Sequence, residues 1–322
     1  MSFIAVDPAT GERIAEVPFE SSTSVEQKIA AAHAAHLEWR LQSIEDRIQP
    51  LLEIGRLLRE RKDDYGALMT REMGKPISQG VAEAAKCAWI CDYYAEQASG
   101  LLMPVDAPTD GTASYWTYRP LGIVLGIMPW NFPFWQVIRF ATPALTAGNA
   151  ALLKHAPCVP GCAAALEQLF HDAGYPEGLF ANLFIGVDTA GDLIDDPRVR
   201  AVSLTGSVQA GRAVAARAGA AIKPCVLELG GSDPSVVLAD ADLDAAAKSC
   251  AMGRLINTGQ SCVAAKRFVV VESVRDAFEK KLVDAMNDWA VGDPADPDTA
   301  LGPMAREDLR DTLHDQVSRS IS

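Results

Sequence analysis

The chain has 322 residues, enough for two packed domains rather than one small core. Its 49% hydrophobic and 22% charged residues give it the composition of a globular protein, which excludes disorder as its dominant state. Lys and Arg number 29 against 42 Asp and Glu, and the resulting net charge of −13 argues against a nucleic-acid partner.

Neither the N-terminus nor any hydrophobic run indicates export or a membrane. Residues 1–8 lack a basic stretch followed by an apolar one, so no export signal is expected. The strongest apolar run, Leu121–Met128, is far shorter than the roughly 20 residues of a membrane span. The seven cysteines, an odd number, favour reduced thiols in the cytosol over a disulfide framework. We therefore expect a cytoplasmic protein with no membrane partner.

Residues 1–101 have helical periodicity, and we expect no strand among them. Ser24 and Gln27 have the spacing of a capping box, which predicts a helix start before Lys28–Arg40. Further helices are expected at Ile44–Arg61, Tyr65–Met73 and Ile77–Leu101.

A turn-rich break then leads into Thr112–Tyr118, which alternates like an exposed strand and carries Tyr115 and Trp116 as candidate partner contacts. Beyond it, strands alternate with helices, which is typical of a parallel sheet with helices on both faces. The strands are expected at Gly122–Met128, Ala150–Lys154, Leu179–Ile185, Val199–Leu204 and Pro224–Leu229. The helices between them are expected at Phe134–Thr146, Gly161–Ala173, Thr189–Ile194 and Ala210–Ala220. Ligands of such sheets bind at the carboxyl ends of the strands.

After Leu229 the pattern starts again, with further strands and helices on residues 229–322. Strands are expected at Pro234–Leu238 and Arg267–Val271, and helices at Leu243–Leu255, Val274–Trp289 and Arg306–Ser322. The last helix places Leu309, Leu313, Val317 and Ile321 on one apolar stripe. These residues are few for a self-sufficient domain and end without a closing strand, so we expect a chain cut short at its C-terminus.

Two of the predicted strand ends carry residues suited to chemistry. Asn131 lies between Pro129 and Pro133, which rigidify the turn, and its amide can donate to an oxyanion or satisfy backbone groups of the turn. Glu228 ends an apolar strand before two glycines, where a carboxylate either faces a cleft or begins an exposed loop.

A glycine loop and a cysteine turn add two further candidates. The loop from Thr205 through Gly206 and Ser207 runs from a strand into a helix, like a phosphate cradle or a plain helix cap. Cys262 follows a polar, glycine-containing turn, where a reactive thiolate is more typical than a buried inert thiol. The cysteines and histidines do not have the spacing of a zinc site, and no metal is expected.

Together these motifs resemble, in order, those of aldehyde dehydrogenases. They are the Pro129–Pro133 turn, Lys154, Thr205–Ser207, Glu228–Gly231 and Gly259–Cys262. The resemblance runs from Asp7 to Met304, nearly the whole chain. Three further stretches look most like bacterial succinate-semialdehyde dehydrogenases: Thr70–Pro76, Lys154–Pro157 and Gly231–Pro234.

The resemblance implies an α/β, aldehyde-dehydrogenase-like fold. Residues 1–228 would form a dinucleotide-binding domain around the parallel sheet, with residues 109–119 as a projecting oligomerisation arm. Residues 229–322 would form an incomplete α/β catalytic domain. Full-length relatives are homo-oligomers that act on small-molecule aldehydes.

The resemblance also implies a mechanism and a cofactor, NAD or NADP. Cys262 would attack the aldehyde carbon, the Asn131 amide and the Cys262 N–H would hold the oxyanion, and hydride transfer to the nicotinamide would leave a thioester. Glu228 would then activate water to hydrolyse that thioester. The cofactor-binding residues implied are Trp130, Lys154, Pro157, Gly206, Ser207 and Leu229.

The choice of cofactor and substrate depends on three positions. NAD-selective relatives carry, three residues after the lysine, a Glu that repels a 2′-phosphate; here that position is Pro157, and NADP is not excluded. Arg139 lies where a semialdehyde dehydrogenase places an arginine for the far carboxylate, although a surface salt bridge is its other reading. A second substrate arginine of some relatives is Ile256 here.

Two alternatives stay open because relatives continue beyond this chain. One is a catalytically silent fragment that at most binds nucleotide. The other is a thiol-dependent esterase that uses Cys262 and Glu228 without a cofactor.

Overall fold

A five-stranded parallel sheet lies at the centre of the computed structural model, which describes residues 1–321. The strands lie in the order β7-β6-β5-β8-β9, and each neighbouring pair is parallel. Their bounds are β5 Ile123–Ile127, β6 Ala150–Lys154, β7 Phe180–Asn182, β8 Val199–Gly206 and β9 Cys225–Leu229. The parallel sheet predicted from the alternation of strands and helices is confirmed.

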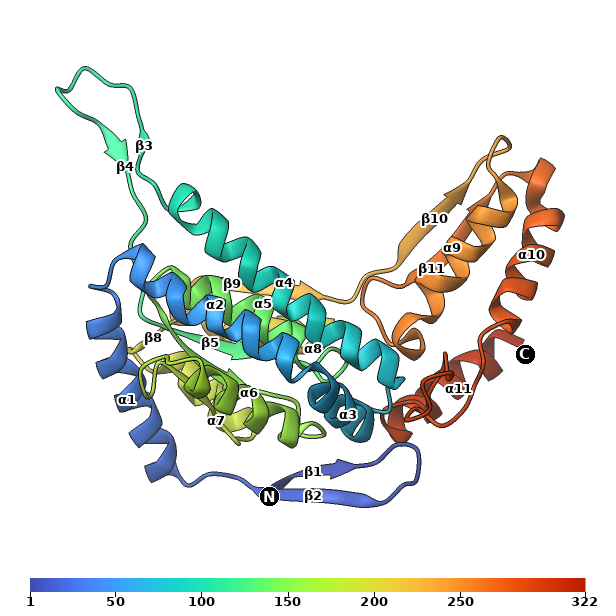
Figure 1. Cartoon of the computed structure of the whole chain (residues 1–322), viewed down its shortest axis with the longest axis horizontal. Helices are drawn as coiled ribbons and strands as arrows, with labels where there is room; N and C mark the ends of the chain where they lie inside the picture. The colour runs from blue at the N-terminus through green and yellow to red at the C-terminus, as the bar shows by residue number, and fades with distance from the viewer. Residues whose placement is uncertain (322) are drawn as a thin grey trace.

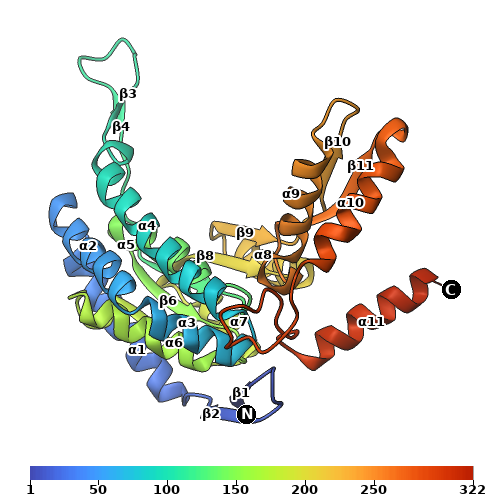
Figure 2. The ribbon, with the colours of Figure 1, turned by 45° about the vertical axis from the view of Figure 1, so that its right-hand side comes forward.

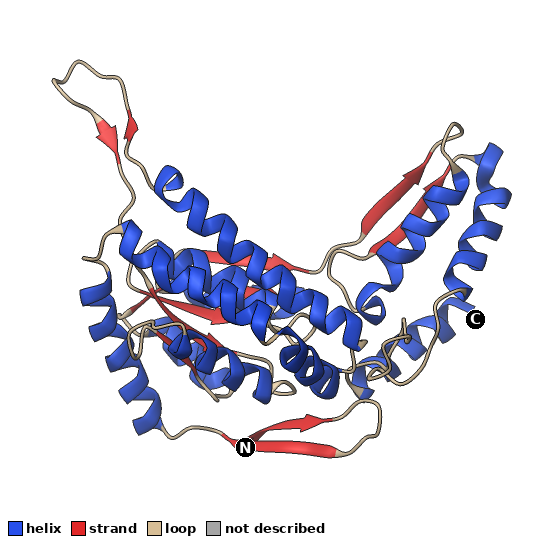
Figure 3. Ribbon diagram, viewed as in Figure 1, coloured by secondary structure: helices blue, strands red, loops and turns tan. Residues whose placement is uncertain are grey.

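Helices connect these strands and cover both faces of the sheet (Figure 3). They are α5 Trp135–Thr146, α6 Pro160–Asp172, α7 Val187–Asp195 and α8 Val208–Ala220. The chain moves outward from β5 to β7 through α5 and α6, then returns to β8 and moves the other way through α7 and α8. Because such crossovers are right-handed, the reversal places the two pairs of helices on opposite faces.

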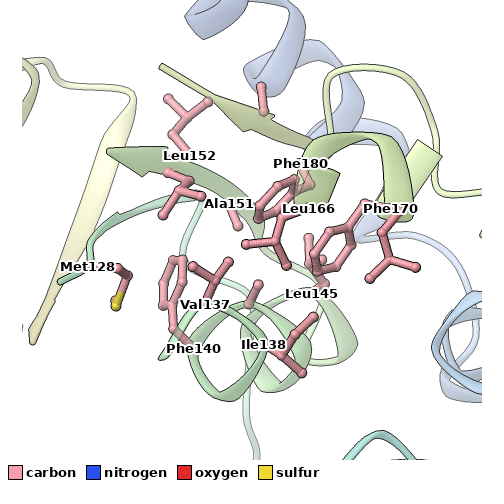
Figure 4. Close-up of a cluster of buried hydrophobic side chains, with 14 of the residues drawn as sticks. Met128, Val137, Ile138, Phe140, Leu145, Ala151, Leu152, Leu166, Phe170 and Phe180 are labelled. Carbon is pink, nitrogen blue, oxygen red and sulfur yellow. The ribbon is translucent and has the colours of Figure 1, made fainter. Parts of the chain in front are cut away.

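The main hydrophobic core lies where β6 meets α5 and α6 (Figure 4). Residues 150–153 of β6 are all fully buried, as expected for a central strand covered on both faces. Phe170 of α6 stacks on Phe180 of β7 with ring centroids 4.0 Å apart. This core fixes the sheet against the helices and therefore fixes the strand ends that carry the candidate residues.

Four helices precede the sheet, as predicted: α1 Ser22–Trp39, α2 Ile44–Glu60, α3 Lys62–Met73 and α4 Ile77–Leu101. The helices α2 and α4 pack against α5 as an outer layer. The predicted capping box of Ser24 and Gln27 is wrong. The N-cap of α1 is Ser21, whose Oγ accepts from the Ser24 N–H at 3.2 Å.

The expectation of no strand in the first hundred residues is also wrong. β1 Ser2–Val6 and β2 Arg13–Pro18 form an antiparallel hairpin along the lower edge of the molecule in Figure 1. Phe3 and Ala5 are buried, and the Phe3 ring packs edge-on against Phe184 at 5.3 Å. The hairpin thus covers one edge of the core.

A second hairpin, β3 Val105–Asp106 with β4 Tyr115–Trp116, projects far from the body (Figure 1). The strand predicted over Thr112–Tyr118 is only these two residues long, because the rest of the segment has no ladder partner among residues 1–321. Tyr115, Trp116 and Tyr118 are exposed on this arm.

Residues 233–321 form a smaller α/β region. Its elements are β10 Asp233–Val237, α9 Leu243–Leu255, the 3-10 turn η1 Ile256–Gly259, β11 Ala265–Val270, a 3-10 turn η2 Glu272–Val274, α10 Arg275–Asn287 and α11 Glu307–Ile321. β10 and β11 pair in parallel over a separate hydrophobic cluster that includes Val237 and Phe278.

The last predicted helix begins at Glu307 and is followed to Ile321; Ser322 lies outside the described residues. Figure 2 shows α11 standing away from the other helices, and none of its described side chains is buried. Among residues 1–321 no helix combines the length and apolar character that crossing a membrane requires.

Candidate active site

A cavity of about 720 Å³ lies between the carboxyl ends of the central strands and the smaller α/β region. Most of the predicted site residues line it: Trp130, Asn131, Gly206, Ser207, Glu228, Leu229 and Cys262. They come from three strand ends and from the segment after η1. Lys154, Pro157 and Arg139 do not line this cavity.

The turn that carries Asn131 is held by the ends of two other elements. The side-chain Nδ2 of Asn131 donates to the Gln260 carbonyl at 3.0 Å, which points the amide toward the segment of Cys262. One N–H of this amide is used in that bond, and the second has no acceptor among residues 1–321. The Asn131 Oδ1 is buried without a hydrogen-bond partner among the described residues.

His155, the residue after β6, secures the other end of the same turn. Its Nδ1 accepts from the Ala156 N–H at 2.8 Å, so its Nε2 carries the proton and donates to the Pro133 carbonyl at 3.0 Å. The ring is fully buried, and burial lowers the pKa of His155 to about 4. At neutral pH this histidine is therefore uncharged and supports the turn through its hydrogen bond to Pro133.

A buried ion pair lies under the start of α5. Glu83 accepts from the N–H groups of Phe134 and Trp135, both at 2.9 Å, and Lys75 donates to the same carboxylate. The ammonium of Lys75 lies 4.5 Å from the centroid of the Phe132 ring. The carboxylate thus satisfies donors that a helix N-terminus leaves without partners, and the cation offsets its charge.

The segment before Cys262 has an unusual backbone. Asn257, Thr258 and Gly259 have φ values of 59°, 56° and 70°, so three successive residues are left-handed. Glycine adopts this conformation readily and asparagine does so more often than other residues, whereas a β-branched residue such as Thr258 is strained there.

Three hydrogen bonds connect this strained turn to distant segments. Gln79 accepts from the Asn257 N–H at 2.6 Å, and Thr258 accepts from the Gly302 N–H at 3.1 Å. Gln260 Oε1 accepts from the Ala305 N–H at 3.0 Å. The turn presents Cys262, which is partly exposed, to the cavity.

Glu228 lies at the cavity wall near the end of β9, with its side chain 51% exposed. This position on the cavity wall, with half of the side chain exposed, agrees with both a cleft residue and the start of an exposed loop. Its Oε1 lies 3.7 Å from Nη1 of Arg139, which α5 carries. Arg139 is therefore adjacent to the carboxylate while lying outside the cavity lining.

The remaining predicted residues divide between the cavity and a neighbouring surface. Gly206 and Ser207 line the cavity directly before α8. Ser207 caps this helix, and its Oγ accepts from the Ala210 N–H at 3.2 Å. Lys154 is buried at the end of β6, and burial lowers its pKa. Pro157 is exposed three residues later.

Sequence reasoning missed the residues that hold the two turns. Lys75 lies in a stretch that suggests only a subgroup, and nothing in the local sequence indicates a positioning role for Gln79, Glu83, Asn257 or Gln260. A buried Lys-Glu pair eight residues apart leaves no local signal, since both residue types are ordinary on a protein surface.

A model of the aldehyde dehydrogenase family matches residues 2–322. The chain belongs to this family. It is 48% identical to a succinate semialdehyde dehydrogenase, named for NAD(P)+, of Escherichia coli strain K12, over 99% of this chain and 69% of the relative. It is 45% identical to a protein named a probable NADP+ succinate-semialdehyde dehydrogenase of a Synechocystis species, over 100% of this chain and 71% of the relative.

Solved aldehyde dehydrogenases have the same fold. The succinic semialdehyde dehydrogenase of Streptococcus pyogenes, solved with NADP+, superposes with a TM-score of 0.96 at 35% identity, covering 98% of this chain and 70% of that one. The α/β fold expected for an aldehyde dehydrogenase is confirmed. The chain spans about 70% of the length of these relatives.

Proposed function

We propose that this aldehyde dehydrogenase oxidises succinate semialdehyde to succinate with NAD or NADP, using Cys262 as its nucleophile. The observation that carries the proposal is the convergence of Cys262, Glu228 and Asn131 on one cavity at the carboxyl ends of the strands. Relatives at 44–48% identity that are named as succinate-semialdehyde dehydrogenases favour this enzyme over a silent fragment.

The residues present fit a dinucleotide. Gly206 and Ser207 line the cavity directly before the N-terminus of α8. Ser207 caps the Ala210 N–H, and the N–H groups of Val208 and Gln209 have no acceptor within the helix and would donate to a pyrophosphate. Trp130 and Leu229 supply apolar walls for a nicotinamide ring. Lys154 would hold the adenosine ribose.

The first step is attack of the Cys262 thiolate on the aldehyde carbon, which forms a C–S bond and leaves an oxyanion. The free N–H of the Asn131 amide and the backbone N–H of Cys262 donate to this oxygen. The chemistry that NAD(P)+ supplies when bound is acceptance of a hydride, which converts the thiohemiacetal on Cys262 into a thioester.

The second step is hydrolysis of the thioester. Glu228 takes a proton from a water molecule, the water oxygen bonds to the acyl carbon, and the C–S bond breaks. The thiolate returns and succinate leaves. The half-exposed position of Glu228 supports this role, because the carboxylate has access to water.

Arg139 would bind the far carboxylate of the substrate. A guanidinium matches a carboxylate with two parallel hydrogen bonds, and Arg139 already lies 3.7 Å from a carboxylate at the cavity wall. Arg254 and Lys266 line the same cavity and add positive charge that attracts an anionic substrate.

We also propose the domain division of the family for this chain. Residues 1–228 would bind the dinucleotide and residues 229–322 would belong to the catalytic domain, which the two separate hydrophobic clusters support. Residues 109–119, with exposed aromatic side chains, would form the oligomerisation arm. The seven cysteines, all free thiols, support a cytoplasmic location.

The test uses the purified wild-type protein and its Cys262→Ala variant. We expect it to reduce NAD or NADP with succinate semialdehyde and expect Cys262→Ala to abolish that reduction while nucleotide binding remains. Undiminished turnover by the alanine variant would show that another residue is the nucleophile.

A further inference from the structure

We propose that Gln79 and Glu83 are positioning residues that set the Asn131 turn and the Cys262 loop at a fixed separation. This inference rests on the proposed function, because it concerns the residues assigned there to oxyanion binding and nucleophilic attack. We call Gln79 and Glu83, together with Lys75, the α4 brace.

The two side chains lie on one face at the start of α4. Residues four apart on a helix stack one above the other, so Gln79 and Glu83 project in the same direction. Gln79 accepts from the Asn257 N–H at 2.6 Å, and its Nε2 donates to the Ala300 carbonyl at 3.1 Å. Glu83 accepts from the first two N–H groups of the α5 end at 2.9 Å. One turn of helix therefore contacts both site-bearing segments.

The two segments are also joined directly, which closes a ring of contacts. Asn257 Nδ2 donates to the Asn131 carbonyl at 2.8 Å and to the Gln260 carbonyl at 3.1 Å. The Asn131 amide donates to the same Gln260 carbonyl at 3.0 Å. Both segments thus contact α4 and also contact each other. Because a helix such as α4 is rigid, these contacts define where the oxyanion donor lies relative to the loop that ends in Cys262.

Burying the charges of Lys75 and Glu83 costs free energy, and the carboxylate of Glu83 has a specific role as a hydrogen-bond acceptor. The side chains of Lys75 and Glu83 are 0% and 3% exposed, so both are taken out of water. A buried ion pair is no more stabilising than well-packed apolar side chains of similar volume, whereas apolar side chains could not accept the two backbone N–H groups. The pair therefore contributes orientation rather than net stability.

The brace also accounts for the strained backbone of Asn257 and Thr258. A left-handed non-glycine residue persists only where its surroundings over-determine it. The bond from Gln79 to the Asn257 N–H supplies one such constraint from a segment 178 residues away.

The test compares Gln79→Leu with a matched control in the natural protein. Gln79 is only partly buried, so leucine removes both hydrogen bonds at a position that tolerates substitution. The control is Gln97→Leu, the same change at an exposed position of the same helix. Gln79→Glu keeps the acceptor for Asn257 and removes the donor to Ala300.

We expect Gln79→Leu to lower kcat per active site by about 100-fold, the order that a misplacement of about 1 Å produces. Active sites are counted from the burst of reduced cofactor in the first turnover. The KM for cofactor should stay unchanged, Gln79→Glu should recover most of the loss, and Gln97→Leu should match the wild type. A reduced burst with normal kcat per active site would mean a merely structural role and would overturn the inference.

A second readout does not need turnover. Hydrogen exchange at the Asn257 amide should accelerate in Gln79→Leu and not in Gln97→Leu. If the wild type fails to oxidise any aldehyde, the proposed function has failed, and the exchange measurement still judges the brace. Equal exchange in all three proteins would overturn it.

Discussion

The guanidinium of Arg139 lies 3.7 Å from the carboxylate of Glu228, with 33% and 51% of the two side chains exposed. In the proposed function Arg139 binds the substrate and Glu228 activates the water, so the pair would link substrate recognition to hydrolysis. At this exposure the ion pair contributes little to stability. In the proposed function, Arg139 would exchange Glu228 for the carboxylate of the substrate.

Arg139→Met should therefore change substrate selection. We expect the KM for succinate semialdehyde to rise by about 10- to 100-fold, since hydrogen bonds to charged groups contribute about 1.5–3 kcal/mol. An uncharged aldehyde of the same length, butanal, should be oxidised as before. Steady-state kinetics with both aldehydes check this, and an equal loss for both would contradict a role in carboxylate binding.

Glu228→Gln should separate the two chemical steps. The thiol can still attack and the first equivalent of cofactor can still be reduced, whereas loss of the general base slows hydrolysis by about 10²- to 10⁴-fold. Rapid-mixing kinetics should show a burst followed by almost no turnover. Absence of the burst would place Glu228 in the first step instead.

Pro157→Glu should shift the preference between cofactors. A carboxylate at this exposed position would repel a 2′-phosphate on the adenosine ribose and could accept hydrogen bonds from ribose hydroxyls. We expect kcat/KM with NADP to fall by at least about 10-fold, which corresponds to about 1.4 kcal/mol, and kcat/KM with NAD to be kept or improved. Pro157→Gln is the uncharged control, and an equal effect of both substitutions would argue against charge repulsion.

His155 should make the protein less stable in acid. Burial lowers its pKa from 6.5 to about 4, so the folded protein binds fewer protons at this site than the unfolded chain does between those values. The contribution is fully present above pH 6.5 and is lost as pH falls toward 4. It amounts to roughly 3 kcal/mol of unfolding free energy.

Urea unfolding of the wild type and of His155→Gln across this pH range isolates the effect. Other carboxylates titrate in both proteins, so the difference between the two curves reports on His155. We expect the difference in unfolding free energy between the wild type and His155→Gln to decrease as the pH falls. A constant gap would mean that the imidazole has the same pKa folded and unfolded.

The central sheet could be predicted because its strands are continuous apolar runs that end in turn residues, as in residues 150–154. The β1–β2 hairpin was missed, although Phe3 and Ala5 alternate with exposed Ile4 and Val6, the ordinary pattern of a half-buried strand. Two short strands at a chain end carry few residues of periodic signal, and the helices that follow dominate the pattern.

Some residues of the candidate site could likewise be predicted from the sequence, and others could not. Asn131 and Cys262 could be proposed because each lies in a short, unusual turn after a strand or helix, and Glu228 because a carboxylate at the end of an apolar strand is unusual. The contact from Gln79 to Asn257 could not, because it joins residues 178 positions apart and neither residue is unusual in its own surroundings. Local patterns indicate where chemistry occurs, whereas the residues that fix its geometry are set by tertiary packing.

The left-handed run at Asn257, Thr258 and Gly259 has a consequence for laboratory evolution. Glycine at position 258 would remove a strain of about 1–2 kcal/mol. The same change would delete the hydroxyl that accepts from the Gly302 N–H, and the lost hydrogen bond together with the greater freedom of glycine in the unfolded chain costs a similar amount. We therefore expect selection for a higher melting temperature to keep threonine at position 258, so that the strained backbone ahead of Cys262 is retained.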